Sequence, residues 1–600
     1  MFQLCYIDTS GGIYHDKCHN SWRLSLRMKK VITRNVPENI PFLHQHPLLH
    51  RIYAARGITD AAEFNYDLKH LLSYDSLKGI EQAALCLTTA IQEQQHVLIV
   101  GDFDADGATS TALAVLALRT FGLKNVSYLI PNRFDYGYGL TPEIVAVAAQ
   151  KKPHLIVTVD NGIASIDGVK AANEMGIKVL ITDHHLPGDS LPDACAIVNP
   201  NQNGDQFASK NLAGVGVVFY LMLALRAHLR NIGWFISQNI VEPNMAQFLD
   251  IVALGTVADS VILDHNNRIL VTQGINRIRE GKSRLGITAL FAVAKRNYEK
   301  ASVYDFGFVI APRLNAAGRL DDMSLGVECL LTDDPVRART IAKELNMLND
   351  ERREIAEDMQ SQALRVLDNL QLEQDLPPGL CVFEESWHQG VLGILAARLK
   401  DKLYRPVIAF AAISENEIKG SARSVNNVHI RDVLSNIATK NPGLITRFGG
   451  HAMAAGLSLA RENYETFAQA FADEVRQHIT LEDLGGMIYT DGELQAKYFN
   501  MDIAELLHAA GPWGAGFTEP VFFGEFALAS QSIVGQKHLR LNLRHLETKQ
   551  EVNAICFNVN ANIWPNPRYS RAKVVYRLDI NEYNNRRSLQ LIISEIISYE

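Results

Sequence analysis

Three carboxylates occupy alternate positions in residues 101–107 (GDFDADG), directly after a run of apolar residues. In an extended segment alternate side chains share a face, so at least two of Asp102, Asp104 and Asp106 should point the same way. Like charges this close are costly, and a bound cation removes that cost. A calcium loop of the EF-hand type would need a downstream glutamate and flanking helices. Solvated turn acids are the bland alternative, and the spacing favours a cation site.

Further acids and two imidazoles occur in three short motifs, VDNG, TDHH and GTVADS. They supply Asp160, then Asp183 with His184 and His185, and finally Asp259 at the end of a helical pattern. Because neighbouring side chains diverge, we expect one histidine to bind metal and the other to face substrate. Carboxylates with imidazole suit manganese or magnesium better than thiolate-bound zinc. Two such ions, about 3.5 to 4 Å apart, would serve phosphodiester hydrolysis.

Arginines and small residues later in the chain have the character of a phosphate site. Paired glycines let backbone amides approach a phosphate, and guanidinium and hydroxyl groups add donors. The candidates are Ser421, Arg423, Gly449, Gly450, His451, Arg313 and Arg319. A tight turn or a solvated face is the alternative for each. The sequence lacks both the G-x-x-x-x-G-K-[ST] nucleotide loop and the G-x-S-x-G serine elbow.

Short β-branched runs alternate with helical patterns between about residues 95 and 200, which predicts βαβ units around a parallel sheet. The expected strands are 97–100, 126–130, 155–159 and 178–181. Three of them end beside Asp102, Asp160 and Asp183. The carboxyl ends of strands in such a sheet bind ligands, so the acids should meet at one rim.

Three further regions follow. Residues 334–372 predict one long helix or two abutting ones, and a second α/β pattern comes after it. From about residue 486 short strands predict a small barrel of the OB type. Residues 538–544 alternate apolar and polar positions, which places two arginines on the outer face of a strand.

Composition excludes several classes. With 600 residues and 47% hydrophobic residues the chain can form several cores, and disorder is excluded for most of it. A net charge of −8 argues against a uniformly basic protein but allows a local basic groove. Seven scattered cysteines without a C-x-x-C pair favour a reducing cytoplasm. The apolar run 212–225 is too short for a membrane span and predicts a buried helix. No secretion signal is visible, and Met28 is a candidate alternative start.

The order of the motifs resembles the DHH phosphoesterase superfamily, and within it most closely the bacterial single-strand-specific exonucleases, over roughly residues 70–600. The series is DFDADG, VDNG, TDHH, GTVADS, PRLNAAGR and GGHAMAAG. The resemblance implies a parallel-sheet α/β DHH domain (46–333), a connecting helix (334–376), a smaller α/β DHH-associated domain (377–485) and an OB-fold (486–600). Residues 1–45 would be an N-terminal extension, partly disordered.

The same resemblance implies roles for individual residues. The metal ligands would be Asp104, Asp106, Asp160, His184, Asp259 and, less directly, Asp102. Asp160 would bridge two ions, His185 would contact the scissile phosphate, and Asp183 would orient a neighbouring histidine. Some superfamily members have a histidine at the position of Val100, so the first metal here would lack a nitrogen ligand. Strand contacts in the barrel would come from Lys537, Arg540 and Arg544.

The implied activity is 5′→3′ hydrolysis of single-stranded DNA to 5′-mononucleotides with two Mn²⁺ or Mg²⁺ ions, in DNA repair and recombination. The resemblance also implies a monomer that meets a single-stranded-DNA-binding protein and a helicase, with no membrane involved. Two alternatives stay open: a DHH phosphodiesterase acting on short oligonucleotides or cyclic dinucleotides, and a catalytically silent DNA-binding scaffold. Chain length and the arginine loops disfavour an inorganic pyrophosphatase.

Overall fold

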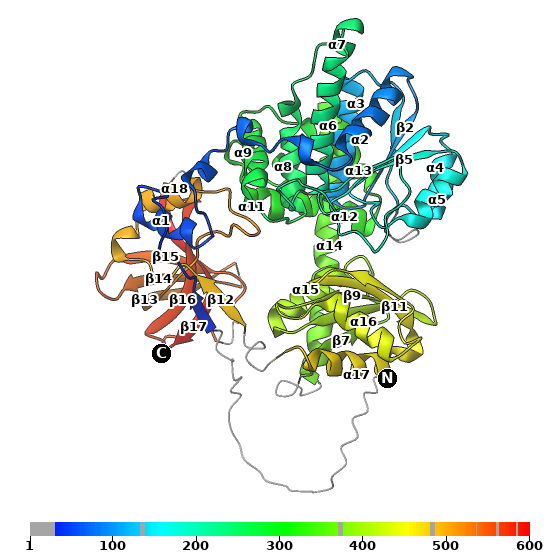
Figure 1. The fold of residues 1–600 in the computed structure, drawn as a ribbon. Coiled ribbons are helices and arrows are strands. Elements are labelled where there is room, and N and C mark those ends of the chain that lie inside the picture. Colours follow the sequence, from blue (N-terminus) through cyan, green and yellow to red (C-terminus); the bar gives the residue numbers. More distant parts are fainter. Residues whose placement is uncertain are drawn as a thin grey trace.

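A computed structural model describes residues 30–132, 138–369, 376–479, 486–535, 537–559, 563–583 and 586–600. Two α/β lobes are joined by the long helix α14 (Pro335–Asn369), and a β-barrel lies beside them (Figure 1). This arrangement confirms the predicted fold class and the single connecting helix. Residues 1–29, most of the predicted N-terminal extension, lie outside the described residues.

The first lobe is built on a parallel five-stranded sheet of order β3-β2-β4-β5-β6. Its strands are β2 (Val97–Gly101), β3 (Val126–Leu129), β4 (Leu155–Val159), β5 (Lys178–Thr182) and β6 (Ala196–Val198). Side chains alternate between two apolar layers: Val97 and Ile99 pack with α2, α3 and α6, whereas Leu98 and Val100 pack with α4 and α5. These helices are α2 (Ile80–Gln92), α3 (Ala105–Thr120), α4 (Pro142–Ala149), α5 (Ile166–Glu174) and α6 (Gly214–Asn231).

The rest of this lobe is helical. It contains α7 (Trp234–Ser237), α8 (Leu249–Ala258), α9 (His265–Arg279), α10 (Leu285–Val293), α11 (Val303–Asp305), α12 (Ala311–Leu320) and α13 (Ser324–Leu331). The apolar run 212–225 forms most of α6, whose first half is fully buried, as predicted. Helix α8 is also buried and packs against α3 and α6. Among the described residues, no helix combines the length and the apolar character needed to cross a bilayer.

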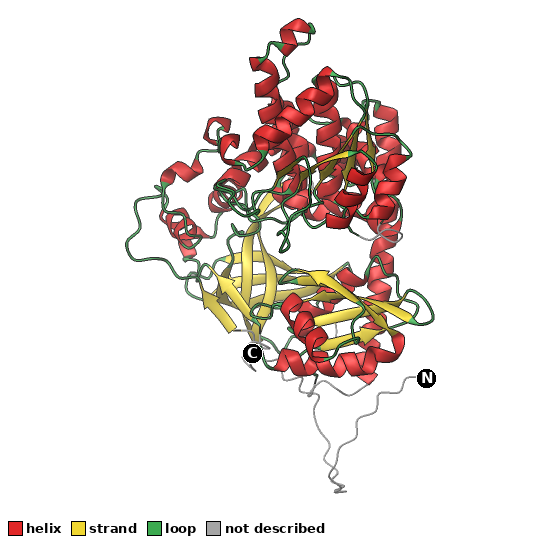
Figure 2. Cartoon of the chain, turned by 45° about the vertical axis from the view of Figure 1, so that its right-hand side comes forward, coloured by secondary structure: helices red, strands yellow, loops and turns green. Residues whose placement is uncertain are grey.

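The second lobe has a mixed sheet of order β10-β11-β9-β8-β7, covered by helices (Figure 2). Its strands are β7 (Leu380–Phe383), β8 (Val407–Ala412), β9 (Glu417–Arg423), β10 (Arg447–Gly450) and β11 (Ala454–Ala460). The helices are α15 (Leu392–Leu403), α16 (Ile430–Lys440) and α17 (Tyr464–Arg476). Only β7 and β8 pair in parallel among these strands, so the glycine-rich segment enters the sheet as an antiparallel hairpin.

The C-terminal barrel closes in the order β13-β14-β15-β17-β16. Its strands are β13 (Phe522–Val534), β14 (His538–His545), β15 (Glu551–Cys556), β16 (Arg571–Tyr583) and β17 (Arg586–Tyr599), preceded by α18 (Met501–Ala509). The alternation in β14 is confirmed, because Leu539, Leu541 and Leu543 are fully buried while Arg540 and Arg544 are exposed.

The N-terminal segment packs on the barrel side of the molecule. Strand β1 (Lys30–Thr33) pairs in parallel with β12 (Met487–Thr490), and α1 (Pro47–Ala54) lies near α18 (Figure 1). The Tyr53 hydroxyl donates to the carbonyl of Ala510 at 2.9 Å. The Arg56 guanidinium donates to both carboxylate oxygens of Asp491, at 2.7 and 3.1 Å. The domain bounds remain predictions. The packing of the N-terminal segment against the C-terminal region was not predicted from the sequence.

Removing the guanidinium should destabilise this contact strongly. The side chains of Arg56 and Asp491 are 2% and 1% exposed, so Arg56→Ala leaves a buried carboxylate without its main partner. We expect a loss of about 3 kcal/mol in the free energy of unfolding, measured by urea denaturation. The matched control, Arg230→Ala, breaks a half-exposed pair with Glu242 and should cost under about 1 kcal/mol. Equal losses in the two variants would contradict the prediction that the buried Arg56–Asp491 pair stabilises the fold more than the exposed Arg230–Glu242 pair.

Candidate metal centre

The first acidic motif folds as the start of a helix. Asp104 is the N-cap of α3, and its Oδ1 accepts hydrogen bonds from the amides of Asp106 (2.9 Å) and Gly107 (3.0 Å). Aspartate is among the preferred residues at the N-cap of a helix, because its carboxylate accepts hydrogen bonds from the free amides of the first turn. The expected extended segment therefore ends at Asp104, because Asp106 already lies in the first helical turn. Asp102 and Asp104 do share a ligand group, as predicted for alternate positions. The acids of this motif belong to two different ligand groups. Asp104 lies with Asp102 and Asp160, and Asp106 lies with His184 and Asp259.

Asp106 is held by the beginning of another helix. Its two carboxylate oxygens accept hydrogen bonds from the amides of Gly214 (2.6 Å) and Val215 (3.0 Å), at the first turn of α6. Amides at a helix N-terminus point outward and favour negative charge. The neighbouring helix α8 can come close because Gly255 has no side chain: a Cβ there would lie 2.9 Å from Asp106 Oδ1. Asp259 caps the end of that helix.

Asp160 follows β4 in a left-handed backbone conformation, with φ at +62°. This conformation is uncommon for residues other than glycine, although aspartate and asparagine tolerate it better than most. Helix α6 packs directly against it, since a Cβ on Gly214 would lie 2.6 Å from Asp160 Cβ. The turn and the close helix together fix where the carboxylate lies.

The two histidines are positioned by the carboxylate before them. Asp183 Oδ1 accepts from the amides of His184 (2.7 Å) and His185 (3.1 Å) and lies 2.7 Å from His185 Nδ1. The side-chain amides of Asn199 and Asn201 donate to the carbonyls of His185 and His184 at 2.9 and 2.6 Å. Because this loop curls around Asp183, the two imidazoles do not diverge as expected; their ring centroids are 4.4 Å apart.

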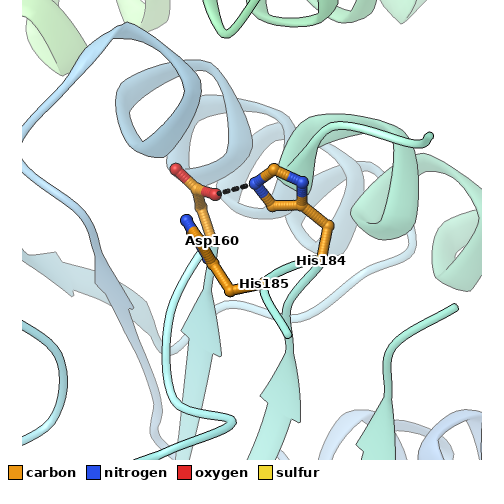
Figure 3. Close-up of side chains that lie close together, drawn as sticks. All are labelled: Asp160, His184 and His185. Atoms are coloured by element: carbon orange, nitrogen blue, oxygen red, sulfur yellow. Dashed lines mark ion pairs between the residues drawn. The ribbon is translucent and has the colours of Figure 1, made fainter. Parts of the chain in front are cut away.

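These side chains meet at the rim of the sheet (Figure 3). His184 Nε2 lies 3.2 Å from Asp160 Oδ1 and 3.4 Å from Asp259 Oδ2. In the part of the chain that the structure describes, three groups have ligand atoms within 4.8 Å of one another, and Asp160 belongs to two of them. The groups are Asp160, His184 and His185; Asp106, His184 and Asp259; and Asp102, Asp104 and Asp160.

Carboxylates this close together repel one another when they are ionised, and bound cations would relieve that repulsion. Burial and the charge of Asp104 raise the pKa of Asp106 to about 7, and burial with neighbouring carboxylates raises the pKa of Asp160 and of Asp259 well above the usual range. Burial and His185 lower the pKa of His184 to about 4, so its imidazole is neutral and can donate a lone pair. Asp160 Oδ1 and His184 Nε2 are buried without a hydrogen-bond partner among the described residues. This donor set fits divalent cations that prefer oxygen and imidazole.

The second lobe reaches the same rim. The ring of His451, directly after β10, stacks on His185 with centroids 5.9 Å apart and an interplanar angle of 15°. Ser421 and Arg423 lie on β9, two strands from the glycine pair Gly449 and Gly450 on β10, with β11 between them. The sheet therefore brings together four of the residues that were proposed to hold a phosphate, and His451 lies beside the acidic cluster; Arg313 and Arg319 are on α12 instead.

Family models match all three folded regions. The DHH family N-terminal domain matches residues 96–256, the DHHA1 domain 377–477 and the RecJ OB domain 490–595. The single-stranded-DNA-specific exonuclease RecJ of Dickeya dadantii is 50% identical, covering 95% of this chain and 98% of the relative. RecJ of Escherichia coli is 49% identical, covering 96% and 99%. The chain belongs to the RecJ family.

Solved RecJ structures share the fold. A crystal structure of RecJ with Mn²⁺ from Thermus thermophilus matches with a TM-score of 0.77 at 26% identity, covering 96% of this chain and 80% of that one. A second from the same organism, with Mg²⁺, matches with a TM-score of 0.71 at 25% identity, covering 94% and 78%. Those two structures hold Mn²⁺ and Mg²⁺, respectively, which are the ions that the acids and His184 predict here. The individual ligand roles in this RecJ-family chain remain proposals.

The remaining predicted residues divide by environment. Arg313, on α12, donates to Asn346 Oδ1 of the connecting helix α14 (3.0 Å) and to the Val309 carbonyl of the first lobe (2.6 Å). Arg319 donates to the Gly390 carbonyl of the second lobe at 3.2 Å. In the barrel, Arg544 pairs with Glu551 at 2.7 Å and Arg540 donates to Ser532, while Lys537 is exposed. Their contacts with substrate stay predictions for a RecJ-family barrel.

Two residues that support the site, Tyr138 and Asn315, were not predicted from the sequence. The Tyr138 hydroxyl lies 3.1 Å from His185 Nδ1 and donates to the Asp160 carbonyl at 3.3 Å. Asn315 Oδ1 accepts from the amide of Ala105 and so supports the start of α3. Asn315 lies in the PRLNAAGR motif, between Arg313 and Arg319, which were the predicted site residues of that motif. Nothing in the spacing around Tyr138 indicated its place.

Replacing Asp183 with asparagine should weaken the RecJ-family metal centre without unfolding it. An amide has one acceptor oxygen in place of two, so it cannot accept from Ile163, His184 and His185 together. We expect at least about a tenfold loss in Mn²⁺ affinity, measured by calorimetry. Asp193→Asn, on an exposed part of the next loop, is the control. An unchanged affinity in Asp183→Asn would contradict the positioning role.

Proposed function

We propose that this chain is a single-stranded-DNA-specific 5′→3′ exonuclease that releases 5′-mononucleotides and serves DNA repair and recombination. The observation that carries the proposal is the partly buried cluster of Asp104, Asp106, Asp160, His184 and Asp259, in a chain that also has a closed OB-type barrel. The relatives named above are single-stranded-DNA-specific exonucleases. A short-substrate phosphodiesterase would have no use for the barrel.

Two divalent cations, when bound, would activate a water molecule and neutralise charge on the phosphodiester. Asp104, Asp106, Asp160, His184 and Asp259 would hold them, with Asp102 beside the first and Asp160 shared between the two. Burial opposes protonation of His185, but the hydrogen bond and charge of Asp183 prevail and raise its pKa to about 9. Held by Asp183 in this way, His185 would donate a hydrogen bond to an oxygen of the scissile phosphate.

The polarity of cleavage would come from the second lobe. Arg423, Ser421 and the amides around Gly450 would hold the terminal 5′-phosphate while His185 faces the next phosphodiester. Gly393 supports this placement, because a Cβ there would lie 2.7 Å from Arg423 Nη2. His451 of this lobe stacks on His185, so a strand end held there would present its first phosphodiester to the acidic cluster, and the product would be a mononucleotide.

The barrel would bind the strand behind the cleaved end through phosphate contacts and base stacking. Single-stranded DNA is accordingly the partner that we propose with most structural support. A single-stranded-DNA-binding protein, a helicase and a monomeric state are proposals that rest on the resemblance alone. The five described cysteines are free thiols, in keeping with a cytoplasmic location.

One assay tests class, substrate and polarity together. The purified chain is incubated with Mn²⁺ and a long single strand labelled at either the 5′ or the 3′ end. We expect labelled mononucleotide to appear at once from the 5′-labelled strand and only late from the 3′-labelled one. Cleavage of dinucleotides alone, or equal release from both ends, would overturn the proposal.

Arg423 should determine the preference for a phosphorylated end. Its guanidinium would form a charge-assisted contact with the 5′-phosphate, which is worth about 1.5 kcal/mol or more. Arg423→Ala should therefore lower the ratio of rates on 5′-phosphate and 5′-hydroxyl strands about tenfold. Arg476→Ala, an exposed arginine on α17 of the same lobe, should leave the ratio unchanged. An unchanged ratio in Arg423→Ala would contradict the proposal that Arg423 binds the 5′-phosphate.

A further inference from the structure

Two thiols lie in contact outside the metal centre. Cys86 Sγ on α2 and Cys195 Sγ, directly before β6, are 3.5 Å apart. Both residues are partly exposed, so a small molecule can reach them. A disulfide has an S–S bond of about 2.05 Å, and the sulfurs would need to approach by about 1.5 Å to form one. No large rearrangement of α2 or β6 is required.

The surroundings favour thiolate chemistry at one of the two sulfurs. The hydrogen bond with Cys195 lowers the pKa of Cys86 to about 6; burial opposes the shift and the charge of Lys178 assists it. The same contact and burial raise the pKa of Cys195. A thiolate next to a protonated resolving thiol is the arrangement found in redox-sensitive cysteine pairs.

The pair is mechanically connected to the metal centre. The Cys195 amide donates to the Val179 carbonyl on β5 at 2.8 Å, and β6 then pairs with β5 as far as Thr182. The Asp183 amide donates to the last residue of β6, Val198, at 3.1 Å. Directly after β6, Asn199 and Asn201 hold the carbonyls of the two histidines. A displacement of β6 toward α2 is therefore transmitted to the loop that carries His184 and His185.

We propose that Cys86 and Cys195 form a reversible disulfide that lowers the activity of the neighbouring metal centre. The oxidant would be a peroxide. The Cys86 thiolate attacks one peroxide oxygen, which breaks the O–O bond, gives a sulfenic acid and releases water after protonation. The Cys195 sulfur then attacks the Cys86 sulfur and displaces its hydroxyl as a second water. Two thiols and one hydrogen peroxide thus become one disulfide and two water molecules, and a thiol reductant reverses the change.

Mass spectrometry tests the cross-link without reference to nuclease activity. The full chain is treated with limiting hydrogen peroxide, alkylated, and digested with trypsin without reductant. Cys86 and Cys195 fall in tryptic peptides 79–119 and 179–210, each of which contains a single cysteine. We expect these peptides to be joined, to separate with dithiothreitol, and to stay apart in Cys86→Ser and Cys195→Ser. Separate alkylation of both residues, or a bond to any other cysteine, would overturn the proposal.

The rate of strand degradation tests the coupling, and this readout rests on the proposed function. The oxidised chain should be slower than the reduced chain by about tenfold, since the supports of metal ligands typically matter to that extent. Cys195→Ser should show no difference, whereas Cys381→Ser, which removes a remote thiol, should behave as the unaltered chain. Equal rates before and after cross-linking would overturn the coupling. Absence of nuclease activity in the reduced chain would instead count against the proposed function.

Discussion

Asp160→Asn should reduce the rate of strand hydrolysis by about a thousandfold or more, because one carboxylate serves two cation positions. Asp160 belongs to two of the three ligand groups, and its Oδ1 faces His184 Nε2 at 3.2 Å. Asparagine keeps the size of the side chain and tolerates the left-handed backbone at this position, so the fold should persist. The loss would therefore report on charge and coordination.

The measurement is single-turnover cleavage of a 5′-labelled strand, together with fluorescence anisotropy of the same strand. Binding should be retained, since the barrel lies outside the cluster. Asp189→Asn, an exposed acid on the loop after the histidines, is the matched control and should cleave normally. Turnover in Asp160→Asn within a few-fold of the control would remove the shared-ligand assignment, whatever the status of the other acids.

The meeting of acids at one rim could be predicted from the sequence, because parallel strands deliver their carboxyl ends to the same edge. Asp160 and Asp183 needed only this rule. The relation of Asp104 to Asp106 could not be predicted from alternation, since a helix begins at Asp104 and its cap overrides the extended pattern. The pairing of α6 with Asp106 was also out of reach, because it joins residues more than a hundred positions apart through two backbone amides.

Gly214→Ala should lower activity about a hundredfold while leaving the protein folded. The added Cβ would lie 2.6 Å from Asp160 Cβ and 2.7 Å from its Oδ1, so the carboxylate or the helix has to move. A displacement of about 1 Å in a reacting group is enough for a loss of that size. Alanine also favours a helix over glycine by roughly 0.5 to 1 kcal/mol, so the helix itself should not suffer.

The matched control lies two residues further along the same helix. A Cβ on Gly216 would meet the flexible end of Leu212 at 3.1 Å and no acid. Gly216→Ala should therefore keep activity within about twofold. Thermal unfolding and Mn²⁺ titration of both variants separate a folding defect from a displaced ligand. Full activity in Gly214→Ala would show that Asp160 is less closely confined than the structure indicates.

Because β1 pairs with β12, it cannot complete its fold until most of the chain has been synthesised. Lys30 emerges from the ribosome early, yet its partner, Met487, is made only in the last part of translation. At roughly 5 to 20 residues per second, the nascent β1 remains without its partner strand for about 20 to 90 seconds. A chain released before the barrel is made would leave β1, Tyr53 and Arg56 without their partners. Proteases that degrade incomplete chains would then find an exposed segment near the N-terminus.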